Sequence, residues 1–279
     1  ISKVMPSFVR RTESTSKYQQ SYTQFMEQMD NDLKVLSDTH GCQVKKEKEP
    51  GVFLVRHDED SVAKIAGALL FEKSSAGLYD LQKYCQDLPE EEIARILDAA
   101  CMSRENRRHK SPRALEHATF TFEIVADYGI YRDLQRHRML TQEKQQLTCD
   151  YGYFIPTEIM GTEMEKEYID AMEKAKKAYD MISTELPEEA QYVVPMAYNM
   201  HWYFNVNLRS LQWMCELRSS PAGHPNYRFV AQEMVSQICS AIPQLERFFK
   251  FVDFEGYELG RMGQEIKKDQ KEKLLNKNG

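Results

Sequence analysis

Hydrophobic residues recur along much of this chain at intervals of three and four, the spacing that places them on one face of an α-helix. In the first such stretch, residues 17–38, the apolar stripe is formed by Tyr22, Phe25, Met29 and Leu33. The same period predicts further helices at residues 60–71, 78–88, 90–101, 130–136, 163–185, 188–197 and 227–249. We therefore expect a largely helical protein in which residues 17–38 form an added arm or linker helix.

Three stretches depart from the helical period and predict strands. Residues 52–55 are a short apolar, β-branched run, typical of a buried strand. From Ala118 to Ile124 apolar residues alternate with Thr119, Thr121 and Glu123, the period of a half-buried strand. Residues 151–155 are aromatic and predict a third strand, ended by a proline. The pattern as a whole indicates helices combined with a sheet.

The domain division follows from the absence of any repeat, low-complexity linker or sharp change in composition. We expect an N-terminal helical arm or linker at residues 1–45, one domain at 46–260, and a charged, frayed tail at 261–279. The chain begins with Ile1 rather than methionine. We therefore expect it to be a processed form or a piece of a longer polypeptide.

Composition narrows the functional classes. The formal net charge of -6 argues against a protein that coats nucleic acid, so an anion site would have to be a local basic pocket. The six cysteines are scattered without a CxxC pair, which favours reduced cytoplasmic thiols over a disulfide framework or a zinc site. No apolar run approaches the roughly 18 residues of a membrane span, and no signal peptide is visible. We predict a cytoplasmic protein with no membrane or metal partner.

The most distinctive cluster of charges is the triplet Arg136, His137 and Arg138. Adjacent positive charges repel one another unless an anion joins them, so the triplet is consistent with a bound polyanion or a polar cofactor. A basic turn at the end of an apolar element explains the same residues. The sequence by itself leaves both interpretations open.

Other polar residues are weaker candidates. Glu116 and His117 precede the alternating strand and could orient a ligand or cap a helix, but the spacing of His109 and His117 is not that of a helical metal site. Arg218 ends an apolar segment, where a cation either stabilises a helix C-terminus or points into a pocket. Neither GxGxxG after a strand nor GxxxxGK[ST] occurs, so a nucleotide would have to be held in another way.

Three segments, taken in this order, resemble the flavin-dependent thymidylate synthases, also called thymidylate synthase complementing proteins. They are HKSPRALEHATFTF at residues 109–122, RDLQRHR at 132–138, and residues 206–224 with NLRSL, a later ELR and His224. With YFIP at 153–156, the similarity covers about residues 50–255. Each segment is short, but their joint order is specific.

The resemblance implies an α+β fold in which an antiparallel sheet is flanked by long helices. It also implies a homotetramer with sites at the subunit interfaces, non-covalent FAD, and reductive methylation of dUMP to dTMP using methylenetetrahydrofolate and NADPH. By position in the family motifs, the residues expected to contact FAD are Ser111, Glu116, Arg136, His137, Arg138, Asn207, Arg209 and His224. Arg218 is expected to contact and polarise the pyrimidine, and the expected substrate-binding residues are Arg132, Thr141 and Lys144.

The departures from the family pattern fall mostly on the substrate phosphate. After Arg-His-Arg the family signature continues x-x-Ser-x-Asn-Glu-x-Ser-x-Arg-Tyr, whereas this chain has Thr141, then Glu143-Lys144, then Gln-Leu-Thr at 146–148. Asp133 stands where a glutamine is common, and Gln191 replaces a further arginine. Each charge-assisted hydrogen bond to a phosphate contributes on the order of 1.5–3 kcal/mol. We therefore expect a weakened dUMP site beside a better preserved flavin site.

Three hypotheses follow. The protein is an active flavin-dependent thymidylate synthase with a divergent phosphate site; or it is a non-catalytic or altered-substrate homologue, one half of a tandem protein whose partner domain supplies catalysis. The third hypothesis is a helical interaction protein whose basic triplet is an ordinary surface feature. Flavin absorbance in the purified protein would exclude the third, and dUMP binding separates the first from the second.

Overall fold

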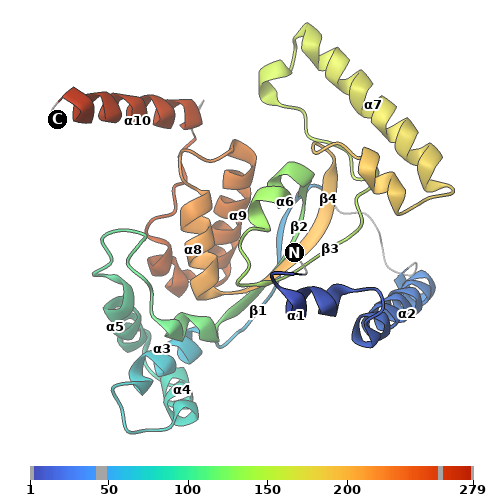
Figure 1. Ribbon diagram of the computed structural model, residues 1–279. Coiled ribbons are helices and arrows are strands. Elements are labelled where there is room, and N and C mark those ends of the chain that lie inside the picture. Colours follow the sequence, from blue (N-terminus) through green and yellow to red (C-terminus); the bar gives the residue numbers. More distant parts are fainter. Residues whose placement is uncertain (1–2, 42–48, 257–259, 278–279) are drawn as a thin grey trace. The chain divides into compact units, whose positions relative to one another are not determined.

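The computed structural model describes residues 3–41, 49–256 and 260–277 (Figure 1). The chain divides into two compact units, Ile1–Lys48 and Glu49–Gly279. The first unit contains α1 (Pro6–Val9), η1 (Arg10–Thr12) and α2 (Lys17–His40). The helix expected at residues 17–38 is confirmed by α2, none of whose residues is buried.

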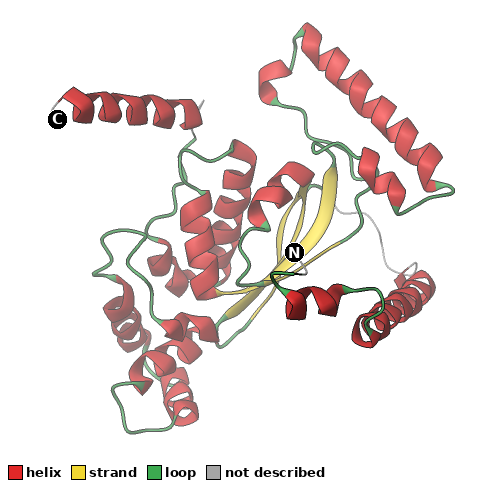
Figure 2. Ribbon diagram, in the orientation of Figure 1, coloured by secondary structure: helices red, strands yellow, loops and turns green. Residues whose placement is uncertain are grey.

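The second unit is built on a four-stranded antiparallel sheet, drawn in yellow in Figure 2. Its strands are β1 (Gly51–His57), β2 (Thr119–Asp127), β3 (Thr141–Lys144) and β4 (Asn199–Asn207), in the order β1-β2-β4-β3. Each neighbouring pair is antiparallel. The predicted α+β class, with an antiparallel sheet flanked by helices, is confirmed.

The alternating sequence pattern decides which face of the sheet is buried. On β2, Phe120, Phe122 and Ile124 are fully buried, and they pair with β4 in a register that joins Thr119 to Asn207 at one end. In the middle of the two strands, the intervening side chains Thr121 and Glu123 of β2 and His201, Tyr203 and Asn205 of β4 point to the opposite face, where they are partly exposed, whereas Val125 further along β2 is buried. One face of the sheet therefore belongs to the core, and the other is polar and open.

Helices cover the apolar face. The helices of this unit are α3 (Ser61–Phe71), α4 (Leu78–Gln86), α5 (Glu90–Cys101), α6 (Tyr128–Leu134), α7 (Glu163–Ser183), α8 (Leu208–Arg218), α9 (Pro225–Ala241) and α10 (Gly260–Lys277). Shorter 3-10 segments are η3 (Arg113–His117), η4 (Thr157–Ile159), η5 (Glu189–Val193) and η6 (Pro243–Phe249). Helices α8 and α9 pack against each other, and α9 also packs on β1. Buried Leu211 of α8, Met234 of α9 and Phe248 of η6 belong to this core.

Two of the expected elements differ in the structure because a single residue interrupts them. The strand expected at residues 151–155 is absent apart from one bridge between Tyr153 and Tyr198, because Gly152 adopts a positive φ of 70° that interrupts an extended path. The helix expected at 227–249 is divided into α9 and η6, because Pro243 has no backbone N–H to continue the helical ladder.

The structure differs from the expected elements in three further respects. Strands β3 and β4 were not predicted, and the helix expected at 188–197 is only the 3-10 segment η5. Pro195 explains the short η5, since the residue before a proline is driven away from helical geometry. The tail expected to be frayed contains α10.

Candidate functional site

The candidate site forms where β4 ends and α8 begins. Because β2 and β4 are antiparallel, Asn207 at the end of β4 lies beside Thr119 at the start of β2. Leu208 then donates its backbone N–H to the carbonyl oxygen of Ala118 at 2.9 Å. The Asn207 side chain caps α8 by accepting from the Ser210 N–H at 2.9 Å. This junction holds the first turn of α8 against the segment that precedes β2.

Arg209, in that first turn, fixes the preceding segment in place. Its Nε donates to the Ser111 carbonyl oxygen at 2.8 Å, and its NH1 nitrogen donates to Glu116 Oε1 at 3.0 Å. Arg113 also binds the Glu116 carboxylate. Hydrogen bonds from Arg113, and secondarily the partner Arg209, lower the pKa of Glu116. Ser111, Glu116, Asn207 and Arg209, distant in sequence, are therefore one cluster with an ionised carboxylate at its edge.

The basic triplet lies on the turn between α6 and β3. The turn is closed by the His137 N–H, which donates to the Leu134 carbonyl oxygen at 3.0 Å. Arg218, at the end of α8, donates from Nε to His137 Nε2 at 3.0 Å and from an NH2 nitrogen to the Asp133 carbonyl oxygen at 2.8 Å. Burial, together with the charge of Arg218, lowers the pKa of His137 to about 4. His137 is thus a neutral acceptor at physiological pH.

The two cations of the triplet have different surroundings. Arg136 forms an ion pair with Asp133 at 3.2 Å. Arg138 has no ion pair with any residue of the described part of the chain. Both line the cavity described next, so the turn presents one partly neutralised charge and one uncompensated charge to it.

A cavity of about 650 Å³ lies between the loop at residues 104–111, the turn at 136–140 and the start of α8. We call it the cationic pocket. Seven of its lining side chains are cationic and one is acidic; the cations are Arg104, Arg107, Arg108, Lys110, Arg136, Arg138 and Arg209. Ser111 and His137 also line it. On a chain of net charge -6, this concentration of positive charge creates a local field that attracts anions.

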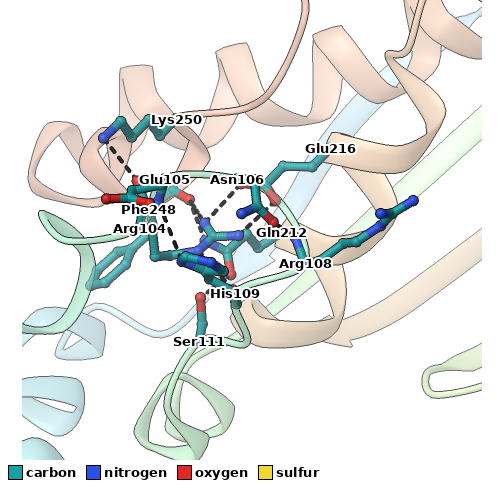
Figure 3. A network of polar contacts seen from close by, with 10 residues as sticks. All are labelled: Arg104, Glu105, Asn106, Arg108, His109, Ser111, Gln212, Glu216, Phe248 and Lys250. Atoms are coloured by element: carbon teal, nitrogen blue, oxygen red, sulfur yellow. Dashed lines mark hydrogen bonds and ion pairs between the residues drawn. The ribbon is translucent and has the colours of Figure 1, made fainter.

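The acidic residue of the cationic pocket is neutralised within the fold. Arg104 and Glu216 form a buried, two-pronged ion pair with donor–acceptor distances of 2.9 and 2.8 Å (Figure 3). Arg104 Nε also donates to the His109 carbonyl oxygen at 3.0 Å. Ser111 Oγ donates to Gln212 Oε1 at 2.5 Å. The network fixes the loop at residues 104–111 and prevents Glu216 from cancelling the other charges.

Sequence reasoning missed the wall formed by residues 104–110, together with Gln212 and Trp213. The signal was present as the cations Arg104, Arg107 and Arg108, but such a cluster is most often a solvated surface feature. A basic surface loop and a basic pocket wall have the same composition. Only the fold distinguishes them, by burying the Arg104 guanidinium under the loop.

The expected substrate-binding residues lie elsewhere. Thr141 and Lys144 line a second cavity of about 770 Å³ on the open face of the sheet, together with Arg56, Glu123 and Glu143. We call it the sheet-face pocket. Its two cations are matched by its two acids, so its charge is far more balanced than that of the cationic pocket.

Arg132 and His224 lie apart from both cavities. The Arg132 guanidinium lies 5.7 Å from the ring centroid of Tyr128, within the same helix α6. His224 caps α9 by accepting from the Asn226 N–H at 3.3 Å. The structure therefore brings together five of the residues expected at the flavin in the cationic pocket. It places Glu116 beside the pocket through Arg209 and Asn207 beside it through Ser210, and it sets His224 and Arg132 apart.

The positions that lack the family's arginines have structural roles. Gln191 accepts from the Leu147 N–H through Oε1 at 3.0 Å, and Thr148 accepts from the Asp150 N–H through Oγ1 at 3.1 Å. Both side chains hold the irregular segment that follows β3. Neither supplies a charged donor for a phosphate.

In this α+β fold, a strand of the antiparallel sheet leads directly into a capped helix beside a strongly cationic pocket. The arrangement defines a class of protein suited to binding an anionic ligand. The family model of the thymidylate synthase complementing proteins matches residues 53–244, and the chain belongs to that family. A UPF0159 protein of Chlamydia pneumoniae is 48% identical over 267 residues, which are 96% of this chain and 50% of that protein. The chain thus spans about half the length of such curated relatives.

Two more distant proteins are also similar. The flavin-dependent thymidylate synthase of Clostridium tetani is 28% identical over 224 residues, covering 71% of this chain and 85% of that protein. The crystal structure of the UMP/dUMP methylase PolB from Streptomyces cacaoi, bound with 5-Br UMP, superimposes with a TM-score of 0.53 at 18% identity, covering 73% of this chain and 94% of PolB. The latter similarity supports the fold.

The described residues contain neither a helix able to span a membrane nor a cluster of metal ligands. None of their helices combines the length and apolar character that crossing a bilayer requires. Within the same residues, no three His, Cys, Asp or Glu side chains converge as metal ligands.

Proposed function

We propose that the cationic pocket binds FAD and that the protein catalyses reductive methylation of dUMP to dTMP, with methylenetetrahydrofolate and NADPH as cosubstrates. The single observation that supports this most is the convergence of Ser111, Arg209 and the Arg136–Arg138 turn on one pocket. These residues come from the three segments that resemble the flavin-dependent family. The relatives from C. tetani and S. cacaoi are named for thymidylate synthesis and for UMP/dUMP methylation.

The donor set of the pocket fits a dinucleotide. Arg108, Lys110 and Arg138 line it without an ion pair to any described residue, so they are available to the pyrophosphate oxygens. The Ser111 hydroxyl and the Arg209 guanidinium add further polar groups to the wall of the pocket. FAD, when bound, supplies the hydride that reduces the transferred carbon, so the protein needs no nucleophile of its own. This agrees with buried Cys149 and Cys215, whose thiol pKa values are raised by burial.

Arg218 remains our candidate for the residue that contacts the pyrimidine. In this structure its Nε and one terminal nitrogen hold His137 and the Asp133 carbonyl, while its guanidinium lies 5.4 Å from the Tyr227 ring centroid. The other terminal nitrogen has no hydrogen bond to the described residues and is available to a substrate. Arg218 would thus both hold the basic turn and polarise the base, with residues of other subunits of a proposed tetramer completing the site.

A second candidate function is favoured by the substituted phosphate residues. Because Gln191 and Thr148 hold backbone N–H groups instead of presenting guanidinium groups, the site for a nucleotide monophosphate lacks two charged forks. The chain also spans about half the length of curated relatives. We therefore propose, as the alternative, an altered-substrate or non-catalytic flavin-binding half of a tandem protein whose other half completes or performs the reaction. A cytoplasmic location stays a prediction under both proposals.

One sample can test both proposals. The purified chain is examined for a flavin absorbance band and then titrated with dUMP, followed by tritium release from labelled dUMP with NADPH and methylenetetrahydrofolate. Flavin, dUMP binding and tritium release together support the synthase. Flavin without dUMP binding contradicts the synthase and supports the alternative, and absence of FAD binding contradicts both.

A matched pair of variants locates the flavin. Arg138→Gln removes an uncompensated charge from the pocket, and we expect FAD to bind at least tenfold more weakly because a charge-assisted hydrogen bond contributes about 1.5–3 kcal/mol. The control variant is Arg95→Gln. It changes an exposed arginine on α5 that pairs with Glu92, and it should leave FAD binding unchanged. Equal FAD affinity in the two variants would contradict the placement.

A further inference from the structure

Trp213 is an unusual member of helix α8. Its neighbours Leu211, Met214 and Cys215 are fully or almost fully buried, whereas Trp213 is 45% exposed and lines the cationic pocket. The guanidinium carbon of Arg107 lies 5.8 Å from the centroid of its ring. The indole is therefore positioned by a cation on one side while part of its surface remains uncovered at the pocket wall.

Most of the uncompensated charges of the pocket lie on the loop that contacts Trp213 through Arg107. Arg136 and Arg209 are paired with Asp133 and Glu116, and Arg104 is paired with Glu216. The four lining cations without an ion pair to a described residue are Arg107, Arg108, Lys110 and Arg138. Three of these four belong to the loop that includes Arg107, the cation over the indole. The loop that supplies three cations without an ion pair thus also contacts the exposed indole ring of Trp213.

We propose that Trp213, held by Arg107, is a stacking platform for the aromatic ring of a phosphorylated ligand, and that residues 107–110 bind the phosphates attached to that ring. An inorganic anion uses only the charges, whereas a nucleotide uses both the charges and the indole face. The inference rests on the proposed function in so far as FAD is the ligand. It assigns to Trp213 the preference for ring-bearing ligands over simple polyphosphates.

The experiment compares four ligands on the full chain by isothermal titration calorimetry: FAD, FMN, ADP and inorganic pyrophosphate. Trp213→Ala removes the ring, Trp213→Leu keeps apolar volume without a ring, and Trp213→Phe keeps a smaller ring. For the ring ligand that stacks, we expect Ala and Leu variants to bind about tenfold more weakly, a change of about 1.4 kcal/mol. The Phe variant should bind within about threefold of the unmodified protein, and pyrophosphate affinity should be unchanged in all three. Circular dichroism checks that each variant is folded.

The ligand panel separates the sources of the ring. Dependence of ADP binding on Trp213 identifies adenine as the stacked ring, and dependence of FMN binding identifies the isoalloxazine. An equal loss of pyrophosphate and ring ligands would show that Trp213 only supports the pocket, and unchanged FAD, FMN and ADP affinities would show that it contacts no ring. Either result would contradict the proposal that Trp213 is a stacking platform.

The outcomes also distinguish the platform from the proposed function. If FAD does not bind but ADP binds in a Trp213-dependent way, the platform stands and the flavin function fails. If FAD binds with no dependence on Trp213, the flavin function stands and the platform fails. If the unmodified protein binds none of the ring ligands, both fail.

Discussion

His137 offers a direct test of how the basic turn is held. In the structure its neutral ring accepts a hydrogen bond from Arg218, and its pKa is about 4, compared with about 6.5 for a free histidine. In the unfolded chain the ring takes up a proton below about pH 6.5. The folded state resists protonation until about pH 4. The stability contributed by this residue should therefore decrease as the pH falls through that interval, and it should change little below or above it.

The pKa difference sets the size of the effect. If fully expressed, it corresponds to about 3.4 kcal/mol of unfolding free energy. The ring is partly exposed, so solvent screening reduces the value, and we expect about 1–2 kcal/mol. The reference variant is His137→Gln, whose amide oxygen can accept the bond from Arg218 but does not titrate. All other titrating groups are shared by the two proteins and cancel in the comparison.

The assay is urea unfolding followed by circular dichroism at a series of pH values from about 7.5 to about 4.5. The unmodified protein should lose about 1–2 kcal/mol more than His137→Gln over this range. Parallel stability profiles for the two proteins would refute the claim that His137 is held neutral by burial and by Arg218.

Further predictions concern stability. Glu216→Gln should lower the unfolding free energy by about 3–5 kcal/mol because it leaves the buried Arg104 charge unpaired, and the double variant Arg104→Met/Glu216→Leu should recover much of the loss; a small loss in the single variant, measured with urea, would contradict this. Gly67→Ala should cost about 1–3 kcal/mol, seen as a lower melting temperature, because its Cβ would approach the Gln82 backbone nitrogen to 2.6 Å. Asp127→Ala should cost about 1 kcal/mol in the same assay by removing the cap on the Ile130 N–H, and an unchanged melting temperature would exclude that role.

The elements that were predicted correctly are those in which a single, regular pattern of apolar residues determines the structure. Helix α2 and strand β2 have clean periods, so both were predicted close to their observed bounds. Strand β3 has the sequence TQEK, with no hydrophobic pattern, and it is a strand because it pairs with β4 at the sheet edge. In β4 the alternation is obscured because Tyr203, on the exposed side, stands between Trp202 and Phe204 on the buried side. Such strands are determined by pairing partners that a local pattern does not reveal.

The candidate site was predictable in part for a similar reason. The Arg136–Arg138 triplet indicated an anion site because the charges are adjacent in sequence. The opposite wall, from Arg107 to Lys110, could not be assigned because its position against the triplet depends on tertiary packing of α8 and the buried Arg104. The resemblance supplied Ser111 and Arg209, but it gave no indication that Trp213 would face the same cavity.

The pairing of β2 with β4 also has a kinetic consequence. The two strands that support both pockets are joined only through α6, β3 and the long excursion containing α7, so their contacts close a large loop. The entropic cost of closing this loop must be overcome before the hydrogen-bond ladder between β2 and β4 forms. Each doubling of the length of a flexible loop raises the free energy of closing it by only about 0.6 kcal/mol. Assembly of the pockets should thus belong to the slow, non-local phase of folding, while the α7 excursion can vary in length at little thermodynamic cost.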